Sequence, residues 1–386
     1  MKSLLIITGI WRAVLMLPDG ELPFTFGLTD SSGHYTMIIR NGDERIEVDE
    51  ITVQGDSIFA RLPVFDSEIR MAVNGNMMTG NFINHSRKEK NVIPVKAVHG
   101  EEYRFVKDTE VPSSKVQGRW ETDFSPGTAD SSKAIGVFEE KANGIVHGTF
   151  LTASGDYRYL EGNISGDSLF LSTFNGAFVY LFKAKITGDS IKGMYYSGMH
   201  WKEPFVAKRN ENFRLPDPYS LTTLKKGIDR ISFSLPDLNG KPVSPDDENF
   251  KNKVVILQLM GSWCSNCLDE SAFLAPVYDK YKERGLEIIG ISFEKTTDFS
   301  KAVSLVSRLK AKYHISYPLV IASRDSAAAT LPMLTKIMGY PTTIYIDKKG
   351  KVRKIYTGFS GPATGVEYEK YKEDFFRLIE TLLNEL

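Results

Sequence analysis

The stretch MGSWCSNCLDE, residues 260–270, constrains this 386-residue chain more than any other, because it holds the only two cysteines. Cys264 and Cys267 are separated by two residues. They follow the near-continuous apolar run KVVILQLM, Lys253–Met260, which is typical of a parallel strand buried on both faces. A helical pattern begins at Cys264. The pair therefore falls where a buried strand gives way to a helix.

Three kinds of site use a Cys-x-x-Cys pair. A structural zinc site needs four ligands, but the chain has no second cysteine pair, and His314 is the only histidine in its C-terminal part. A purely structural disulfide across so short a loop constrains the unfolded chain little. A redox pair fits better, because the N-terminus of a helix stabilises a thiolate. In that interpretation Cys264 attacks a disulfide and Cys267 resolves the mixed disulfide.

The sequence after residue 227 alternates between strand and helix patterns, which predicts an α/β fold with a strand–helix–strand core. A final hairpin and an amphipathic helix complete it. The predicted elements are strands at 286–293 and 317–322, helices at 299–313 and 331–338, a hairpin at 342–356 and a helix at 368–383.

Residues 9 to about 210 contain many short alternating strands separated by turn residues, which predicts all-β structure, either barrel or sandwich. The segment also repeats itself. GIWR at Gly9 matches GRWE at Gly118, and GDSIF at Gly55 matches GDSLF at Gly166, offsets of about 110 residues in both cases. We therefore expect four parts: β-rich unit 1 at 9–110, β-rich unit 2 at 111–211, a linker at 212–227, and an α/β domain at 228–386.

Composition excludes some functions. Forty-eight basic residues balance forty-eight acidic ones, which gives no electrostatic case for a nucleic-acid partner. No apolar run reaches the ~20 residues of a membrane-spanning helix. The first residues, MKSLLIIT, resemble the start of a secretory signal, but the apolar stretch is shorter than the roughly 7–15 residues that a signal needs. A trimmed signal and the absence of one both remain open. Nothing in the sequence indicates a cofactor or a metal site.

Three motifs together resemble the TlpA-like thiol–disulfide oxidoreductases, which have the thioredoxin-like fold. They are SWCSNCLDE, GYPTTIYIDKKGKV and, as a lead-in hairpin, FSLPDLNGKPVS at Phe233. The resemblance covers roughly residues 228–386. It implies that Cys264 is the attacking cysteine, Cys267 the resolving cysteine and Pro341 a cis-proline.

The same resemblance assigns further site residues. Trp263 matches the tryptophan before the cysteine pair, and a cis bond at Pro341 aims the backbone of Tyr340 at an extended substrate segment. Glu270 matches a glutamate that takes the proton from the resolving thiol; an ordinary first-turn acid is the alternative. Members of the family often carry a buried carboxylate where this chain has Gln258, so proton handling here must rely on Glu270, water or neither.

The resemblance implies a reductase of protein disulfides in the bacterial cell envelope, re-reduced by an upstream thiol protein. Two alternatives stay open. A peroxiredoxin-like antioxidant shares the fold, although such enzymes carry a threonine where this chain has Gly261. A binding protein, whose β half holds a ligand or partner, belongs to a different class.

Overall fold

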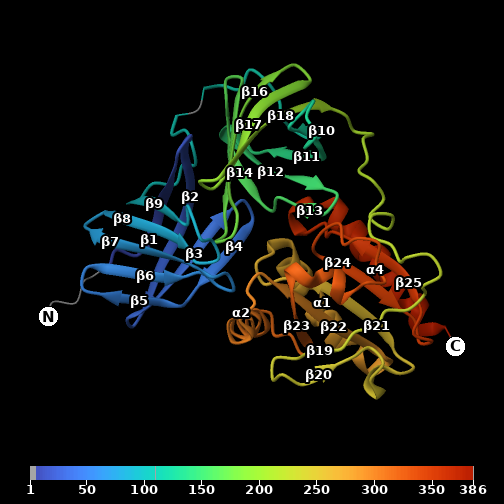
Figure 1. Cartoon of the computed structure of the whole chain (residues 1–386). Coiled ribbons are helices and arrows are strands. Elements are labelled where there is room, and N and C mark those ends of the chain that lie inside the picture. Colours follow the sequence, from blue (N-terminus) through green and yellow to red (C-terminus); the bar gives the residue numbers. More distant parts are fainter. Residues whose placement is uncertain (1–5, 109, 386) are drawn as a thin grey trace. The chain divides into compact units, whose positions relative to one another are not determined.

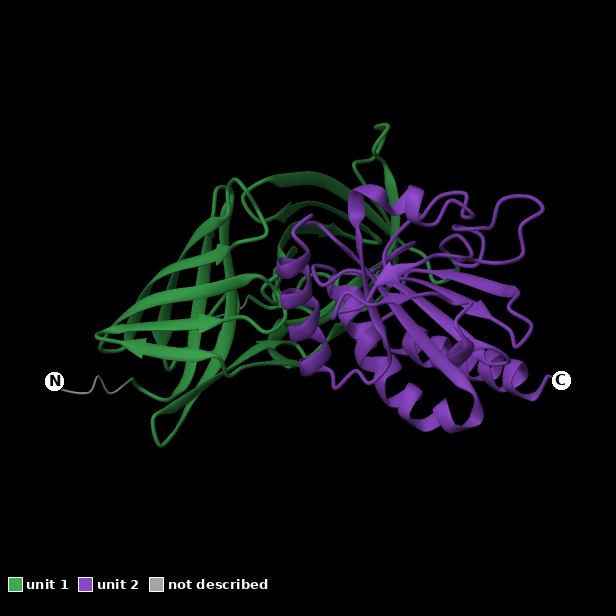
Figure 2. Ribbon diagram, turned by 60° about the horizontal axis from the view of Figure 1, so that its bottom comes forward, with its two compact units in different colours: residues 1–151, 157–214 green, residues 152–156, 215–386 purple. Residues whose placement is uncertain are grey.

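The computed structural model describes residues 6–108 and 110–385. The chain divides into two compact units (Figure 2). The first comprises Met1–Leu151 and Tyr157–Arg214, and the second comprises Thr152–Asp156 and Leu215–Leu386. Among the described residues, no helix is both long and apolar enough to cross a membrane.

The first unit contains a nine-stranded antiparallel sheet in the order β4-β3-β2-β1-β9-β8-β7-β6-β5 (Figure 1). Its inward side chains form one core with Trp11 and Phe26, both fully buried. The strands are β1 (Gly9–Leu17), β2 (Gly20–Ser31), β3 (His34–Asn41), β4 (Glu44–Val48), β5 (Ile51–Gln54), β6 (Ser57–Arg61), β7 (Ser67–Asn74), β8 (Met77–Asn84) and β9 (Val92–His99).

A second nine-stranded sheet follows in the order β11-β10-β18-β17-β16-β15-β14-β12-β13. Aromatic rings fill its core, with Phe150 and Phe182 fully buried. The strands are β10 (Gly118–Phe124), β11 (Ser132–Glu140), β12 (Ile145–Thr152), β13 (Gly155–Asp156), β14 (Leu160–Ser165), β15 (Ser168–Phe174), β16 (Val179–Thr187), β17 (Ser190–Ser197) and β18 (Trp201–Arg209).

In both sheets the first strand pairs with the second and with the last, in agreement with the sequence repeat. Strand β1 pairs with β2 and β9, and β10 pairs with β11 and β18, always antiparallel. Trp11 and Trp120 hold equivalent places near the starts of β1 and β10, and both are fully buried. The Nε1 of Trp11 donates to the carbonyl of Ile7 at 3.1 Å, and that of Trp120 to the carbonyl of Val116 at 2.7 Å. The predicted fold class of this part, repeated all-β structure of the barrel or sandwich kind, is confirmed by the two sheets.

The second unit has a five-stranded sheet in the order β23-β22-β21-β24-β25. Strands β21, β22 and β23 run parallel, and β24 and β25 antiparallel to their neighbours. Helices α1 and α4, whose bounds are given below, pack together through aromatic rings: the ring centroids of Phe273 in α1 and Phe375 in α4 lie 5.0 Å apart. This is a thioredoxin-like fold, as the sequence predicts. The elements are β19 (Leu235–Pro236), β20 (Pro242–Val243), β21 (Val254–Met260), α1 (Ser265–Tyr281), β22 (Leu286–Glu294), α2 (Phe299–Lys312), β23 (Leu319–Ser323), α3 (Ala327–Thr330), β24 (Thr342–Ile346), β25 (Val352–Thr357) and α4 (Val366–Asn384).

One predicted element is wrong. The helix expected at 331–338 is absent, and only the short α3 precedes that segment. The backbone of residues 331–338 pairs instead with a segment that precedes β19 in the chain. Leu334 forms a bridge with Leu224, and the amide of Thr335 donates to the carbonyl of Thr223 at 2.8 Å. Because those groups are used between segments, they do not close helical turns.

Candidate functional site

The cysteine pair lies at the start of α1, directly after the central strand β21. Cys264 is the N-cap residue, and its Sγ accepts a hydrogen bond from the amide of Cys267 at 3.2 Å. The two sulfurs are joined in a disulfide, with the Cα atoms 5.2 Å apart. Cys264 retains 8% of its surface exposed, whereas Cys267 has none. Only the first cysteine can therefore meet a partner directly.

Residues at the end of strand β22 form hydrogen bonds to Ser262 and Trp263, which directly precede the cysteine pair. Glu294 is 1% exposed. Its carboxylate accepts from the amide of Ser262 at 2.9 Å, the hydroxyl of Ser262 at 2.7 Å and the hydroxyl of Ser292 at 2.6 Å. The indole of Trp263 donates to the carbonyl of Phe293 at 2.9 Å. These bonds fix the backbone on which Cys264 is presented.

The peptide bond between Tyr340 and Pro341 is cis, as the resemblance implies. The carbonyl oxygen of Tyr340 lies 3.5 Å from the Sγ of Cys264. The ring of Tyr340 meets that of Trp263 edge-on, with centroids 5.7 Å apart. The structure thus brings four of the predicted site residues together around the outer sulfur: Trp263, Cys264, Tyr340 and Pro341.

Two cations lie over the ring of Trp263. Lys295 Nζ lies 4.6 Å and the guanidinium carbon of Arg324 4.5 Å from the ring centroid of Trp263. Both residues are exposed. The sequence analysis missed them, because they follow β22 and β23 and no motif connects them to the cysteines. Their signal is positional: both lie just past the carboxyl ends of parallel strands, the edge where α/β folds place their sites.

Glu270 lies under the pair in a fully buried polar network. Its carboxylate accepts from Gln258 Nε2 at 2.9 Å and from the hydroxyl of Thr343 at 2.5 Å. Gln258 accepts in turn from the hydroxyl of Tyr317 at 3.2 Å, and its Nε2 lies 3.5 Å from the carbonyl of Cys267. Burial raises the pKa of Glu270 to about 7, against the lowering effect of its hydrogen bonds. A carboxyl group with this pKa can both hold and release a proton near neutral pH.

A short segment from between β12 and β14 also belongs to this unit. Asn266, inside the Cys-x-x-Cys motif, donates from Nδ2 to the carbonyl of Asp156 at 3.0 Å. The carboxylate of Asp156, itself 3% exposed, accepts from the amide of Gly361 at 2.7 Å. No sequence motif indicates this contact, because Asp156 lies in the β repeat, far from the cysteines along the chain.

Among the described residues, no group of three or more His, Cys, Asp or Glu side chains is placed to hold a metal ion. What the site offers is a disulfide at a helix N-terminus, a cis-proline loop beside the outer sulfur, and a titratable carboxyl group beneath. This arrangement on this fold defines a thioredoxin-like thiol–disulfide oxidoreductase.

Comparison with known proteins agrees. Residues 228–355 match the AhpC/TSA family. The chain is 31% identical over 145 residues to the thiol-disulfide oxidoreductase ResA of Bacillus thuringiensis subsp. konkukian, covering 38% of this chain and 75% of the relative. It is 29% identical over 136 residues to ResA of Bacillus subtilis, covering 35% and 69%. The chain belongs to the ResA family of thiol-disulfide oxidoreductases.

A solved structure of a thioredoxin-family thiol:disulfide interchange protein from Chlorobium tepidum is 24% identical, with a TM-score of 0.33. It covers 42% of this chain and 100% of that chain.

Proposed function

We propose that this protein reduces disulfides of partner proteins in the bacterial cell envelope, with Cys264 as the attacking and Cys267 as the resolving cysteine. The observation that carries the proposal is the position of Cys264. Its sulfur caps α1, keeps the exposed share of the pair, and lies 3.5 Å from the carbonyl of Tyr340 before the cis-proline. A helix N-terminus stabilises the thiolate that attack requires.

The reaction proceeds in two exchanges. In the reduced protein the thiolate of Cys264 attacks one sulfur of the substrate disulfide, forms a mixed disulfide and releases the other substrate sulfur as a thiolate, which takes up a proton. Cys267 then loses its proton and attacks the sulfur of Cys264, which releases the second substrate thiol. The substrate gains two electrons and two protons, and the protein ends in the disulfide form seen here.

Glu270 receives the proton of Cys267 in this proposal. It follows Cys267 by three residues in α1, so both side chains lie on one face of the helix. Its pKa of about 7 suits transfer from a thiol near neutral pH. Since Gln258 cannot titrate, Glu270 carries this role without a second buried carboxylate at the strand.

Trp263, Tyr340 and Pro341 form the substrate-binding surface in this proposal. The cis bond turns the Tyr340 backbone toward Cys264, where an extended segment of a partner protein can align beside the sulfur. An upstream thiol protein must then reduce the Cys264–Cys267 disulfide for the next cycle. We also propose that residues 9–110 and 111–211 are two β-rich units, and that 212–227 links the second of them to a thioredoxin-like domain at 228–386.

The experiment compares the reduced wild type with Cys264→Ser and Cys267→Ser, using insulin as the protein disulfide. We expect the wild type to reduce insulin, Cys264→Ser to be inactive, and Cys267→Ser to accumulate a mixed disulfide that gel electrophoresis without reductant detects. Glu373→Ser, on the exposed face of α4, controls for substitution itself. Undiminished activity of Cys264→Ser would contradict the assignment of the attacking cysteine.

Peroxide reduction is the second candidate function, favoured by the match of residues 228–355 to the AhpC/TSA family. Against it, the position that carries threonine in peroxiredoxins is Gly261, where a Cβ would collide with the Trp263 ring. Peroxide consumption by the reduced protein, measured beside insulin reduction, separates the two activities. Faster turnover of peroxide than of insulin would favour the antioxidant function.

A further inference from the structure

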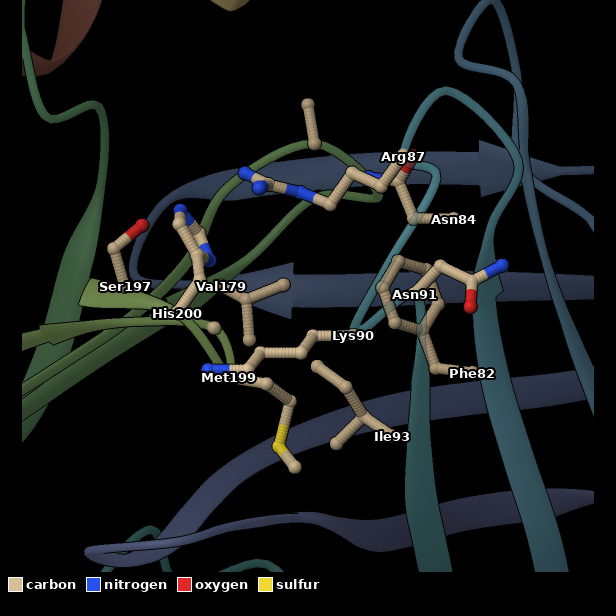
Figure 3. Close-up of a pocket in the computed structure, with 12 residues that line it drawn as sticks. Phe82, Asn84, Arg87, Lys90, Asn91, Ile93, Val179, Ser197, Met199 and His200 are labelled. Carbon is tan, nitrogen blue, oxygen red and sulfur yellow. The ribbon is translucent and has the colours of Figure 1, made fainter.

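The first unit contains a pocket that the redox chemistry does not use (Figure 3). It is small and partly open to solvent. Three parts of the chain line it: the end of β8 with the loop to β9, the start of β16, and the turn between β17 and β18. Phe82, Ile93 and Val179 form its apolar base and belong to the core of the first sheet.

The rim of this pocket is positively charged. Arg87 and Lys90 line it from the β8–β9 loop, and His200 lines it from the opposite turn. Figure 3 shows the two long side chains extending from their loop toward that turn. None of the lining residues is an aspartate or glutamate. In the parts of the chain that the structure describes, no carboxylate forms an ion pair with Arg87 or Lys90.

The charges on the rim act on one another. The pKa of His200 is lowered, first by partial desolvation and then by the positive charges of Arg87 and Lys90. Like charges gathered on one rim repel each other, and a bound anion would relieve that repulsion. The turn also requires a particular backbone: Gly198 has φ +57°, and a Cβ there would crowd the His200 ring at 3.2 Å.

The chemistry of the rim defines the kind of anion. The guanidinium fork of arginine matches the oxygens of a phosphate, and a lysine ammonium supplies a point charge. Asn84, Asn91 and Ser197 add neutral hydrogen-bonding groups at the rim. Two permanent positive charges fit a dianion better than a single carboxylate.

We propose that this pocket is a phosphate-binding site, for inorganic phosphate or the phosphate group of a small ester, held by Arg87, Lys90 and His200. The site is separate from the cysteine pair, so it can be tested whether or not the proposed disulfide reductase activity holds. It gives the β half a ligand of its own.

The test follows the imidazole resonances of the full chain by NMR across pH, in chloride and in inorganic phosphate at equal ionic strength. His200 is assigned by its loss in His200→Gln. Phosphate should raise the pKa of His200 by about half a unit or more, which corresponds to about threefold tighter binding to the protonated form. The resonances of His34 and His85, which do not line the pocket, should not shift.

Variants decide between a site and general surface charge. Calorimetric titration of the wild type should give a dissociation constant at or below about 1 mM, and Arg87→Ala and Lys90→Ala should each weaken binding about tenfold. Lys88→Ala is the matched control, because Lys88 lies in the same loop but does not line the pocket. It should bind as the wild type does.

Three results would overturn the proposal: equal shifts at all histidines, equal loss of affinity in Lys88→Ala and Arg87→Ala, or binding only far above 1 mM. Acetate at equal ionic strength should bind more weakly than phosphate, and equal affinity would refute the dianion argument. Glycerol phosphate distinguishes the two sources, since tighter binding than inorganic phosphate indicates an ester as the ligand. Because Arg87 and Lys90 are exposed, their variants should fold, which circular dichroism checks.

Discussion

Replacing Glu270 with glutamine should stabilise the second unit at alkaline pH and leave it almost unchanged at acid pH. Burial raises the pKa of Glu270 from 4.5 to about 7. The folded state therefore binds a proton that the unfolded chain has lost in the interval between these values. An acid with a raised pKa in the folded state favours folding below its unfolded pKa, and this contribution is lost as the pH rises through the folded pKa.

The magnitude follows from the shift. The difference between about 7 and 4.5 is about 2.5 units, and each unit corresponds to about 1.4 kcal/mol. At about pH 8 the ionised wild type should thus be less stable than Glu270→Gln by about 3 kcal/mol, and at about pH 4.5 by less than about 0.5 kcal/mol. Glutamine keeps the shape and neutrality of the protonated acid, so Gln258 and Thr343 retain a partner.

Guanidinium unfolding of the disulfide form, repeated across pH, measures this difference. Pulse-labelling hydrogen exchange, read by mass spectrometry on peptides from β21 and β22, assigns the transition to the second unit. Keeping the disulfide intact removes thiol titration from the measurement. Glu373→Gln on exposed α4 removes one charge without burial and should show no comparable pH-dependent gain.

A stability difference that stays constant with pH would refute the reasoning, because it would mean that Glu270 is equally protonated in both states. A variant that is less stable than the wild type at alkaline pH would show that the ionised carboxylate is the favoured partner of Gln258 and Thr343. In either case Glu270 would lose its support as the group that receives the proton of Cys267.

Three further changes test other parts of the structure. Arg324→Glu should slow reaction of the reduced protein with the anionic disulfide dithiodipropionate several-fold relative to cationic cystamine; an unchanged ratio of stopped-flow rates would contradict this. Tyr317→Phe removes the hydroxyl that donates to Gln258 at 3.2 Å and should destabilise the second unit by about 1 kcal/mol in the same unfolding assay; a neutral effect would argue against the network. Trp120→Phe leaves the Val116 carbonyl without its 2.7 Å partner and should destabilise the first unit by about 2 kcal/mol or more, measured on its own unfolding transition.

The sequence predicted the redox half well because its signals are local. A buried strand, a cysteine pair and a helix start follow one another between residues 253 and 282, and the fold places them as the pattern indicates. The repeat at Trp11 and Trp120 could be recognised for the same reason: each lies near the start of a strand, and each is fully buried in a core.

The failures share a different cause. Residues 331–338 have helical spacing but pair with the segment at Leu224, and the contact of Asn266 with Asp156 joins residues 110 apart. Arg324 and Lys295 meet at Trp263 only because the parallel strands end at one edge. Such long-range contacts form only in the assembled sheet, so the local periodicity of the sequence cannot predict them.

Gln258 shows how one such contact changes the chemistry. From the sequence it reads only as the absence of a carboxylate on the central strand. In the fold its amide donates to Glu270 and Tyr317 donates to it, so the strand position orients the helix carboxyl group instead of competing with it for a proton. A second buried acid there would add like-charge repulsion and raise the pKa of Glu270 further. With glutamine, the site keeps one titrating carboxyl group with a pKa of about 7, which suits a single proton transfer in each resolving step.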